Sequence, residues 1–220
     1  SLTAVMVREA NGAKRLARLL ADKRLNAVLL GPGQGVGKAT RDAVAAAAKA
    51  GRALVLDADA LTSFSESPES LARLLSKVPS AILTPHDGEF ARLFGRQSKI
   101  VRGESRVDRA RVGARKLRAV MLLKGPDTVV ASPDGRAAIA ANAPPWLATA
   151  GSGDVLAGIA AGLLAQDMPA FEAACAAVWL HGEAGAEAGP GLISEDLEPA
   201  LRTVLGRLLR GLESAASAGS

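Results

Sequence analysis

A turn of glycine, serine and glycine, followed at once by an aspartate, precedes an apolar helical pattern in the stretch AGSGDVLAG. Gly151 and Gly153 would leave backbone amides uncovered at the start of that helix. The amino end of a helix carries about half a positive charge, so bare amides there form an anion site. Asp154 could accept a proton from a group that reacts with the anion, or it could simply cap the helix. The glycines favour the anion site, because a cap does not need them.

His86 and Glu89 lie three residues apart in the stretch TPHDGE, at the expected start of another helix. Side chains with this spacing share one face of a helix. His86 could donate a hydrogen bond to an anionic or amide group, and Glu89 could hold a metal-bound water. Ordinary helix-start chemistry is the alternative, with Asp87 and Glu89 complementing the helix dipole. These residues alone leave both interpretations open.

Lys124 ends an apolar run in the stretch LKGPDTVV. A lysine at the end of a buried strand is costly unless its ammonium group meets an anion or water, and a neighbouring phosphate would satisfy it. The alternative is a lysine that extends its charged end to solvent before an ordinary hairpin turn.

The glycine-rich stretch GPGQGVGK, residues 31–38, follows another apolar run. It is not a Walker phosphate loop, because Pro32 and Ala39 occupy positions that require glycine and a hydroxyl residue. It also lacks the third glycine of the dinucleotide-binding pattern. The missing side chains would still let a ligand approach the backbone. A plain strand-to-helix turn explains the stretch equally well.

Three other polar side chains are weaker candidates. Asp57 and Asp59 follow an apolar run, where carboxylates often only cap the next turn. His181 lies in a helical pattern beside Trp179, and a packing role explains it better than metal binding, because it has no ligand spacing with His86.

Short apolar runs alternate with longer helical patterns along the chain. The expected strands are residues 26–31, 52–57, 80–84, 119–124, 128–132 and 137–141. The expected helices cover about residues 12–22, 38–50, 68–78, 87–95, 104–117, 153–166, 170–188 and 196–212. This alternation predicts an α/β protein whose mainly parallel sheet has helices on both faces. The last two strands, joined by the turn sequence PDG, predict an antiparallel hairpin at one edge.

In such a sheet, ligands bind beyond the carboxyl ends of the strands. The glycine-rich, aspartate, histidine and lysine stretches each come directly after an expected strand. They should therefore meet at one end of the sheet.

Composition narrows the class of protein. The 220 residues, 49% of them hydrophobic, suffice for one domain. No apolar run is long enough to span a membrane, and the single cysteine, Cys175, cannot form an internal disulfide, so we expect a cytoplasmic protein.

The net charge is +5, and residues 99–120 carry eight basic and two acidic side chains. We expect a solvated helix face there and no nucleic-acid partner, because no aromatic residue interrupts the charges.

Five motifs in this order, GPGQG, DADAL, TPHDGEFARLFG, KGPDTVV and TAGSGDVLAG, resemble the ADP-dependent NAD(P)H-hydrate dehydratases of the ribokinase-like superfamily. The resemblance covers residues 25–197. It implies a three-layer ribokinase-like sandwich. It also implies repair of the (S)-form of hydrated NADH or NADPH. In that reaction phosphate passes from ADP to the ring hydroxyl, giving AMP, and phosphate is then eliminated to restore NAD(P)H.

The resemblance assigns roles by position. Gly35, His86 and Asp154 would contact the hydrate, with Asp154 as the catalytic base. Glu89 takes the place of an acid associated with Mg²⁺ and would act through water. ADP, or ATP, would be the phosphoryl donor. The residues expected at the nucleotide are Lys124, Gly125, Pro126, Asp127, Thr128, Gly151, Ser152 and Gly153.

The resemblance also carries expectations about the whole protein. Family members begin with another strand and a glycine-containing substrate loop before the segment that matches Leu25. We therefore expect residues 1–220 to be a single dehydratase domain without its amino-terminal part and first strand, and with uncertain activity on its own. A homo-oligomer, tetrameric or larger, is implied, and the full-length protein could carry a fused epimerase domain.

Two other functions stay open at this point. One is a kinase of the same superfamily that acts on a small vitamin precursor or sugar, although those kinases have an asparagine-containing version of PHDGE. The other is a catalytically silent nucleotide-binding domain.

Overall fold

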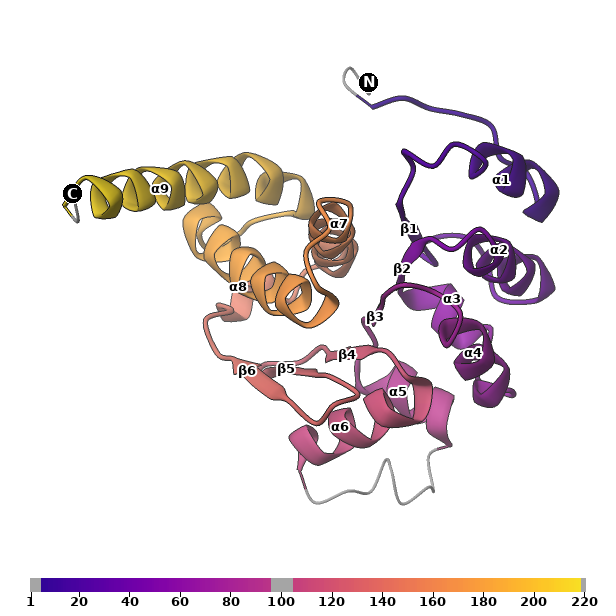
Figure 1. Ribbon diagram of the computed structural model, residues 1–220. Helices are drawn as coiled ribbons and strands as arrows, with labels where there is room; N and C mark the ends of the chain where they lie inside the picture. Colours follow the sequence, from indigo (N-terminus) through magenta and orange to yellow (C-terminus); the bar gives the residue numbers. More distant parts are fainter. Residues whose placement is uncertain (1–4, 96–104, 219–220) are drawn as a thin grey trace.

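The computed structural model describes residues 5–95 and 105–218. Residues 99–104, the first part of the basic segment, therefore lie outside the described residues. Within the described chain, six strands form one open sheet (Figure 1). The strands are β1 (Ala27–Leu30), β2 (Ala53–Leu56), β3 (Ala81–Leu83), β4 (Val120–Leu123), β5 (Thr128–Ala131) and β6 (Ala137–Ala140).

Each strand pairs with its neighbours in the sequence, so the order across the sheet is β1-β2-β3-β4-β5-β6. β1 to β4 are parallel, and β5 and β6 form an antiparallel hairpin beside β4. All six predicted strands and the edge hairpin are confirmed. The parallel register pairs Leu30 with Leu56 and Leu56 with Leu83, so these three strands end level with one another. The loops that follow them consequently start side by side.

Helices cover both faces of the sheet (Figure 1). One face carries α1 (Ala13–Leu19), α2 (Lys38–Lys49), α3 (Ala58–Thr62), α4 (Pro68–Leu75), α5 (Asp87–Phe94) and α6 (Arg106–Leu117). The other face carries α7 (Ser152–Leu164) and α8 (Ala170–Ala188), and α9 (Leu197–Ala218) packs on α8. Two short 3-10 helices, η1 (Pro145–Leu147) and η2 (Ser194–Asp196), connect these elements. The predicted three-layer α/β architecture is confirmed.

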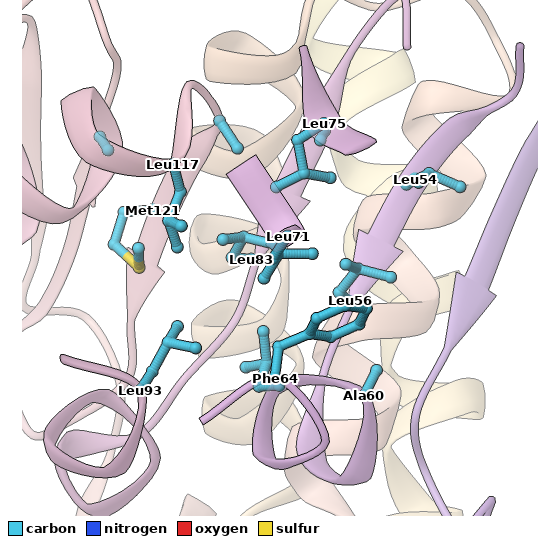
Figure 2. Packing of buried hydrophobic residues seen from close by; sticks show 14 of the residues in the cluster. Leu54, Leu56, Ala60, Phe64, Leu71, Leu75, Leu83, Leu93, Leu117 and Met121 are labelled. Carbon is cyan, nitrogen blue, oxygen red and sulfur yellow. The ribbon is translucent and has the colours of Figure 1, made fainter. Parts of the chain in front are cut away.

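Side chains along each strand point alternately to the two faces of the sheet, and they contribute to a separate hydrophobic core on each face. Leu54 and Leu56 point to the layer of α2 to α6, where Leu71 and Phe90 pack on them, and Figure 2 shows Leu54, Leu56 and Leu71 in this core. Val55, between the two leucines, belongs instead to the cluster with α7 and α8. Successive strand residues face opposite sides, so a strand buried on both faces must be apolar throughout. This is why the predicted strands appear as continuous apolar runs.

The structure differs from the predicted elements at α3 and at the end of α9. α3 was not predicted, because five residues are too few to show a helical period. α9 continues to Ala218, beyond the predicted end at residue 212. β1 is the last strand at its side of the sheet, and the described residues do not test whether another strand belongs outside it. Among the described helices, none is long and apolar enough to cross a bilayer.

Candidate active site

The amino end of α7 has the shape that the glycine turn predicts. Gly151 is the N-cap residue, with a left-handed φ of 82°. The amides of Asp154 and Val155 donate to the Gly151 carbonyl at 3.0 and 3.2 Å, so the turn itself uses them. The amide of Gly153 has no hydrogen-bond partner among the described residues. It therefore stays available to an anion at the positive end of the helix dipole.

Asp154 and Ser152 point in different directions. Asp154 is exposed, and its carboxylate makes no hydrogen bond or ion pair with a described residue, so it is not occupied as a helix cap. The Ser152 side chain is buried and donates to the Leu147 carbonyl at 2.8 Å. Only the backbone of Ser152 could therefore meet a nucleotide.

His181 supports this turn from α8. Its Nε2 lies 3.4 Å from the Ser152 Oγ, and the residue is 7% exposed. Burial lowers the pKa of His181 to about 4, a hydrogen bond to Ser152 opposes this shift, and the charge of Lys124 adds to it. His181 is thus a neutral imidazole beneath the anion turn, and its predicted packing role gains a specific partner.

His86 and Glu89 form a capping box at the start of α5. The His86 Nδ1 accepts from the amides of Gly88 and Glu89 at 2.9 and 3.3 Å, and the Glu89 Oε2 accepts from the His86 amide at 2.9 Å. Because Nδ1 is an acceptor, this hydrogen-bond network assigns the proton of the neutral ring to Nε2. The Nε2 is 3.5 Å from Glu89 Oε1, and the His86 side chain is half exposed. Helix-start chemistry is therefore present, and the N–H that remains on the half-exposed His86 lies near the Glu89 carboxylate.

Lys124 joins the histidine loop to the end of β4. Its amide donates to the Pro85 carbonyl at 2.8 Å, which makes a parallel bridge between His86 and Lys124. Its Nζ lies 2.8 Å from the Asp57 Oδ1. A Cβ added to Gly153 would lie 3.4 Å from the same Nζ. The ammonium group therefore sits between a buried carboxylate and the amino end of α7.

The turn after Lys124 is closed by Thr128 and clamped by Arg106. The Thr128 Oγ1 donates to the Gly125 carbonyl at 3.0 Å, while Pro126 and Asp127 are exposed at the tip of the turn. The Arg106 Nη2 donates to the Lys124 carbonyl at 3.0 Å. A Cβ on Gly125 would lie 2.3 Å from that Nη2, so a side chain there would have to displace the Arg106 guanidinium group.

The glycine-rich loop after β1 is anchored by Asp59. The Gly35 amide donates to the Asp59 Oδ2 at 2.8 Å, and the Gly35 carbonyl accepts from the Thr40 hydroxyl. Gly35 has a φ of 78°, and the space where its side chain would be is open. With both backbone groups used, Gly35 could meet a ligand through its bare Cα.

Comparison with known proteins decides the family. The family model described as NAD(P)H-hydrate dehydratase matches residues 1–199. The chain belongs to the NAD(P)H-hydrate dehydratase family. The sequence motifs had placed the start of the match at residue 25, and the family model begins earlier, at residue 1.

Two relatives illustrate the similarity. The chain is 39% identical over 196 residues to the ADP-dependent (S)-NAD(P)H-hydrate dehydratase of Neisseria meningitidis, covering 86% of this chain and 66% of that protein. It is 42% identical over 164 residues to a bifunctional NAD(P)H-hydrate repair enzyme of Thermofilum pendens, covering 74% of this chain and 30% of that protein. The chain thus spans less than two thirds of the length of these relatives.

A solved structure has the same fold. The ADP/ATP-dependent NAD(P)H-hydrate dehydratase of Bacillus subtilis, co-crystallised with ATP/Mg²⁺, superposes with a TM-score of 0.68 and 29% identity. The superposition covers 87% of this chain and 69% of that structure.

Within this dehydratase fold, sequence reasoning ranked one residue of the site too low and missed another. Asp57 was only a weaker candidate, because a carboxylate after a strand often just caps the next turn, yet it makes no side-chain cap bond to the described residues of α3 and pairs with Lys124 instead. Arg106 was assigned to a solvated basic face. It bonds to Asp87 at the start of α5 and to carbonyls at the end of β4. In the sequence, the only indication of a role for Asp57 or Arg106 is that a charged residue lies next to a predicted buried element.

The prediction of a solvated face is also wrong for two other arginines of α6. Arg109 lies 3.4 Å from Asp87, and Arg111 donates to the Gly135 carbonyl at 2.9 Å. These side chains serve the fold, because α6 packs beside the ends of the strands that they reach.

Proposed function

We propose that this chain catalyses the ADP-dependent dehydration of the (S)-form of hydrated NADH or NADPH, with release of AMP and phosphate. The observation that carries the proposal is the position of the Lys124 ammonium beside Gly153, where α7 begins with the exposed carboxylate of Asp154. A backbone amide that can donate to an anion, an ammonium group and a free carboxylate then lie together at the amino end of α7. Phosphoryl transfer needs this combination, because it depends mainly on positioning and charge neutralisation.

The nucleotide would lie over the end of β4 and the start of α7. The Gly153 amide and the Lys124 ammonium would face its phosphates. The segment from Gly125 to Thr128 would contact the rest of the nucleotide, because Pro126 and Asp127 are exposed there.

Asp154 would act as the general base. As the hydroxyl on the nicotinamide ring attacks the terminal phosphorus of ADP, its proton would pass to the Asp154 carboxylate and AMP would leave. Phosphate would then leave from the ring carbon while the adjacent ring carbon loses a proton, which restores the ring double bond. General-base catalysis of this kind contributes about 10²- to 10⁴-fold to a rate.

His86 and Gly35 would form part of the substrate side. The Nε2–H of neutral His86 can donate to an amide or hydroxyl oxygen of the hydrate. The open space at Gly35 would admit a ring close to the backbone.

The residues suit Mg²⁺ only as a partner of the nucleotide. The described residues contain no group of three side chains that could cage a metal. Glu89 is 7% exposed and its Oε2 already accepts from the His86 amide, so it could hold the ion through a water. Mg²⁺ usually keeps several waters and binds through one or two carboxylates plus phosphates. When bound, it would neutralise phosphate charge.

Location and assembly belong to the same proposal. We place the protein in the cytoplasm as a homo-oligomer, tetrameric or larger. We also propose, from the family resemblance, that the full-length protein could carry an epimerase domain; the Thermofilum relative is named as bifunctional.

Turnover of hydrated NADH tests the proposal. The chain is incubated with ADP, Mg²⁺ and (S)-hydrated NADH, and NADH absorbance, AMP and phosphate are measured together. We expect the three products in equal amounts, and only when the hydrate is present. Asp154→Asn should lower kcat by about 10²- to 10⁴-fold while ADP still binds in calorimetry.

Two outcomes would contradict this function. Net accumulation of a phosphorylated small molecule from ATP would indicate a kinase, and ADP binding without any turnover would indicate a silent nucleotide-binding domain. Asp167→Asn is the matched control, because it removes a carboxylate just beyond the other end of α7 and should leave turnover unchanged.

A further inference from the structure

Asp57 is a buried carboxylate to which the proposed chemistry gives no role. It follows β2 and is 1% exposed. It occupies the N-cap position of α3, where an aspartate normally accepts hydrogen bonds from the first helix amides. Among the described residues it makes no such bond, and its Oδ1 lies 2.8 Å from the Lys124 Nζ.

The backbone that carries Asp57 is held from two sides. Its amide donates to the Leu30 carbonyl at 3.1 Å. Its own carbonyl passes so close to Gly31 that a Cβ there would lie 1.8 Å away. The next residue, Ala58, has a left-handed φ of 45°, which is unfavourable for a residue with a Cβ. The carboxylate therefore projects from a fixed point at the end of the parallel sheet.

Lys124, in contrast, has a long side chain with many rotamers. An ammonium group on such a chain loses much conformational freedom when it is held in one place. Its side chain is 20% exposed, and its Nζ lies within 3.4 Å of the position that a Gly153 Cβ would take. Without a fixed partner, the ammonium could turn toward solvent and away from α7.

We infer that Asp57 is a positioning residue whose carboxylate holds the Lys124 ammonium at the amino end of α7, where the transferred phosphate binds. The identity of that anion rests on the proposed function, whereas the ion pair does not. Asp57 also neutralises the ammonium before a phosphate arrives, which makes a partly buried cation tolerable there. Correct placement matters most in the transition state, because a displacement of about 1 Å can cost 10²-fold in rate.

Asp57→Asn keeps the shape of the side chain and removes its charge. We expect kcat to fall about 10- to 100-fold. The KM for ADP should change less than about threefold, because the phosphate still attracts Lys124 in the ground state. An unchanged kcat, or a loss confined to KM, would overturn the inference.

A double-mutant cycle with Lys124→Met separates positioning from a general structural role. If Asp57 acts through Lys124, adding Asp57→Asn to Lys124→Met should change kcat less than about twofold. Equal losses of kcat in both backgrounds would overturn the inference. The double variant should also regain melting temperature that Lys124→Met alone loses, because the single variant leaves a buried carboxylate unpaired. The double variant removes both charges of the pair, so it keeps the test possible if Asp57→Asn alone folds poorly.

The ion pair can be tested without turnover. In the chain labelled with ¹⁵N at its lysine side chains, the signal of the Lys124 ammonium group is identified by its loss in Lys124→Met. We expect Asp57→Asn to shift or abolish that signal. Asp134→Asn is the control, because it removes a carboxylate from the turn between β5 and β6, at the opposite end of the sheet.

The two proposals can fail separately. A Lys124 signal that is unaffected by Asp57→Asn would overturn the inference. A complete absence of turnover in the unaltered chain would contradict the proposed function, and the NMR result would then decide the role of Asp57.

Discussion

At the scale of single residues, Gly151 determines the geometry of the anion turn. Its φ of 82° is one that residues with a Cβ rarely adopt, and a Cβ there would lie 2.8 Å from the Ser194 Oγ. We expect Gly151→Ala to lower the free energy of unfolding by about 1–2 kcal/mol from the backbone conformation alone. Urea denaturation measures this change.

Gly158 offers a matched control within the same helix. It lies inside α7, and a Cβ there would meet nothing within 4 Å. Gly158→Ala should leave stability unchanged or raise it by about 0.5–1 kcal/mol, because alanine is the better helix former. Equal effects of the two substitutions would show that the left-handed turn at Gly151 carries no cost.

His181 predicts a pH dependence of stability. Its pKa falls from 6.5 to about 4 on folding, chiefly through burial. Between these two values the unfolded chain binds a proton that the folded chain does not, so stability is lost as the pH falls from about 6.5 towards 4. The full shift corresponds to about 3 kcal/mol.

The measurement compares the chain with His181→Gln. Glutamine can still bond to the Ser152 hydroxyl, but it does not titrate. Between pH 7 and pH 4.5 the unaltered chain should lose about 2–3 kcal/mol more than the variant in urea denaturation. Parallel pH profiles would contradict the assignment of a buried, neutral His181.

At the scale of elements, Arg106 ties α6 to two of the site loops. Its guanidinium group bonds to Asp87 at the start of α5 and to the carbonyls of Leu123 and Lys124 at the end of β4. Its side chain is only 22% exposed. One residue therefore fixes the histidine loop relative to the lysine turn.

Arg106→Met should lower the free energy of unfolding by about 1–3 kcal/mol, because it removes the donor from two partly buried carbonyls. It should also raise the KM for ADP, since the Lys124 turn loosens. Arg115→Met is the control, because Arg115 lies exposed on the same helix. Equal stability of the two variants in urea would show that the clamp is not needed.

The sequence predicts the elements better than the contacts between them. Apolar runs and helical periods placed six strands and eight helices correctly, because burial on two faces leaves a strong pattern. The motifs also identified which loops would meet at the sheet end. Asp57 and Lys124 are 67 residues apart, and only the register of β2, β3 and β4 brings them together. Such a pair has no local signal, which is why Asp57 was only a weaker candidate.

At the scale of the whole molecule, ligand binding should couple to overall stability. The proposed nucleotide site draws on β4 and α7, which belong to different parts of the chain. ADP at about 100 times its Kd should stabilise the fold by about 2.7 kcal/mol. For a chain of this size, each kcal/mol raises the Tm by about 2–4 °C.

Differential scanning fluorimetry with ADP and Mg²⁺ measures this shift. Mg²⁺ alone is the control and should leave the Tm nearly unchanged. A Tm that does not respond to saturating ADP would contradict the nucleotide site.

The division of the helices between the two faces affects the order of folding. α1 to α6 and the sheet precede α7 in the chain, so one apolar face of the sheet, including Val55 and Ile82, has no cover until α7 and α8 have been synthesised. During translation the first part of the domain can therefore fold on one side only, with its other side exposed to aggregation or chaperones. α7, which brings Asp154, also begins to close that face. The second core and the proposed active site are consequently completed in the same late step of folding, once α7 and α8 have been synthesised.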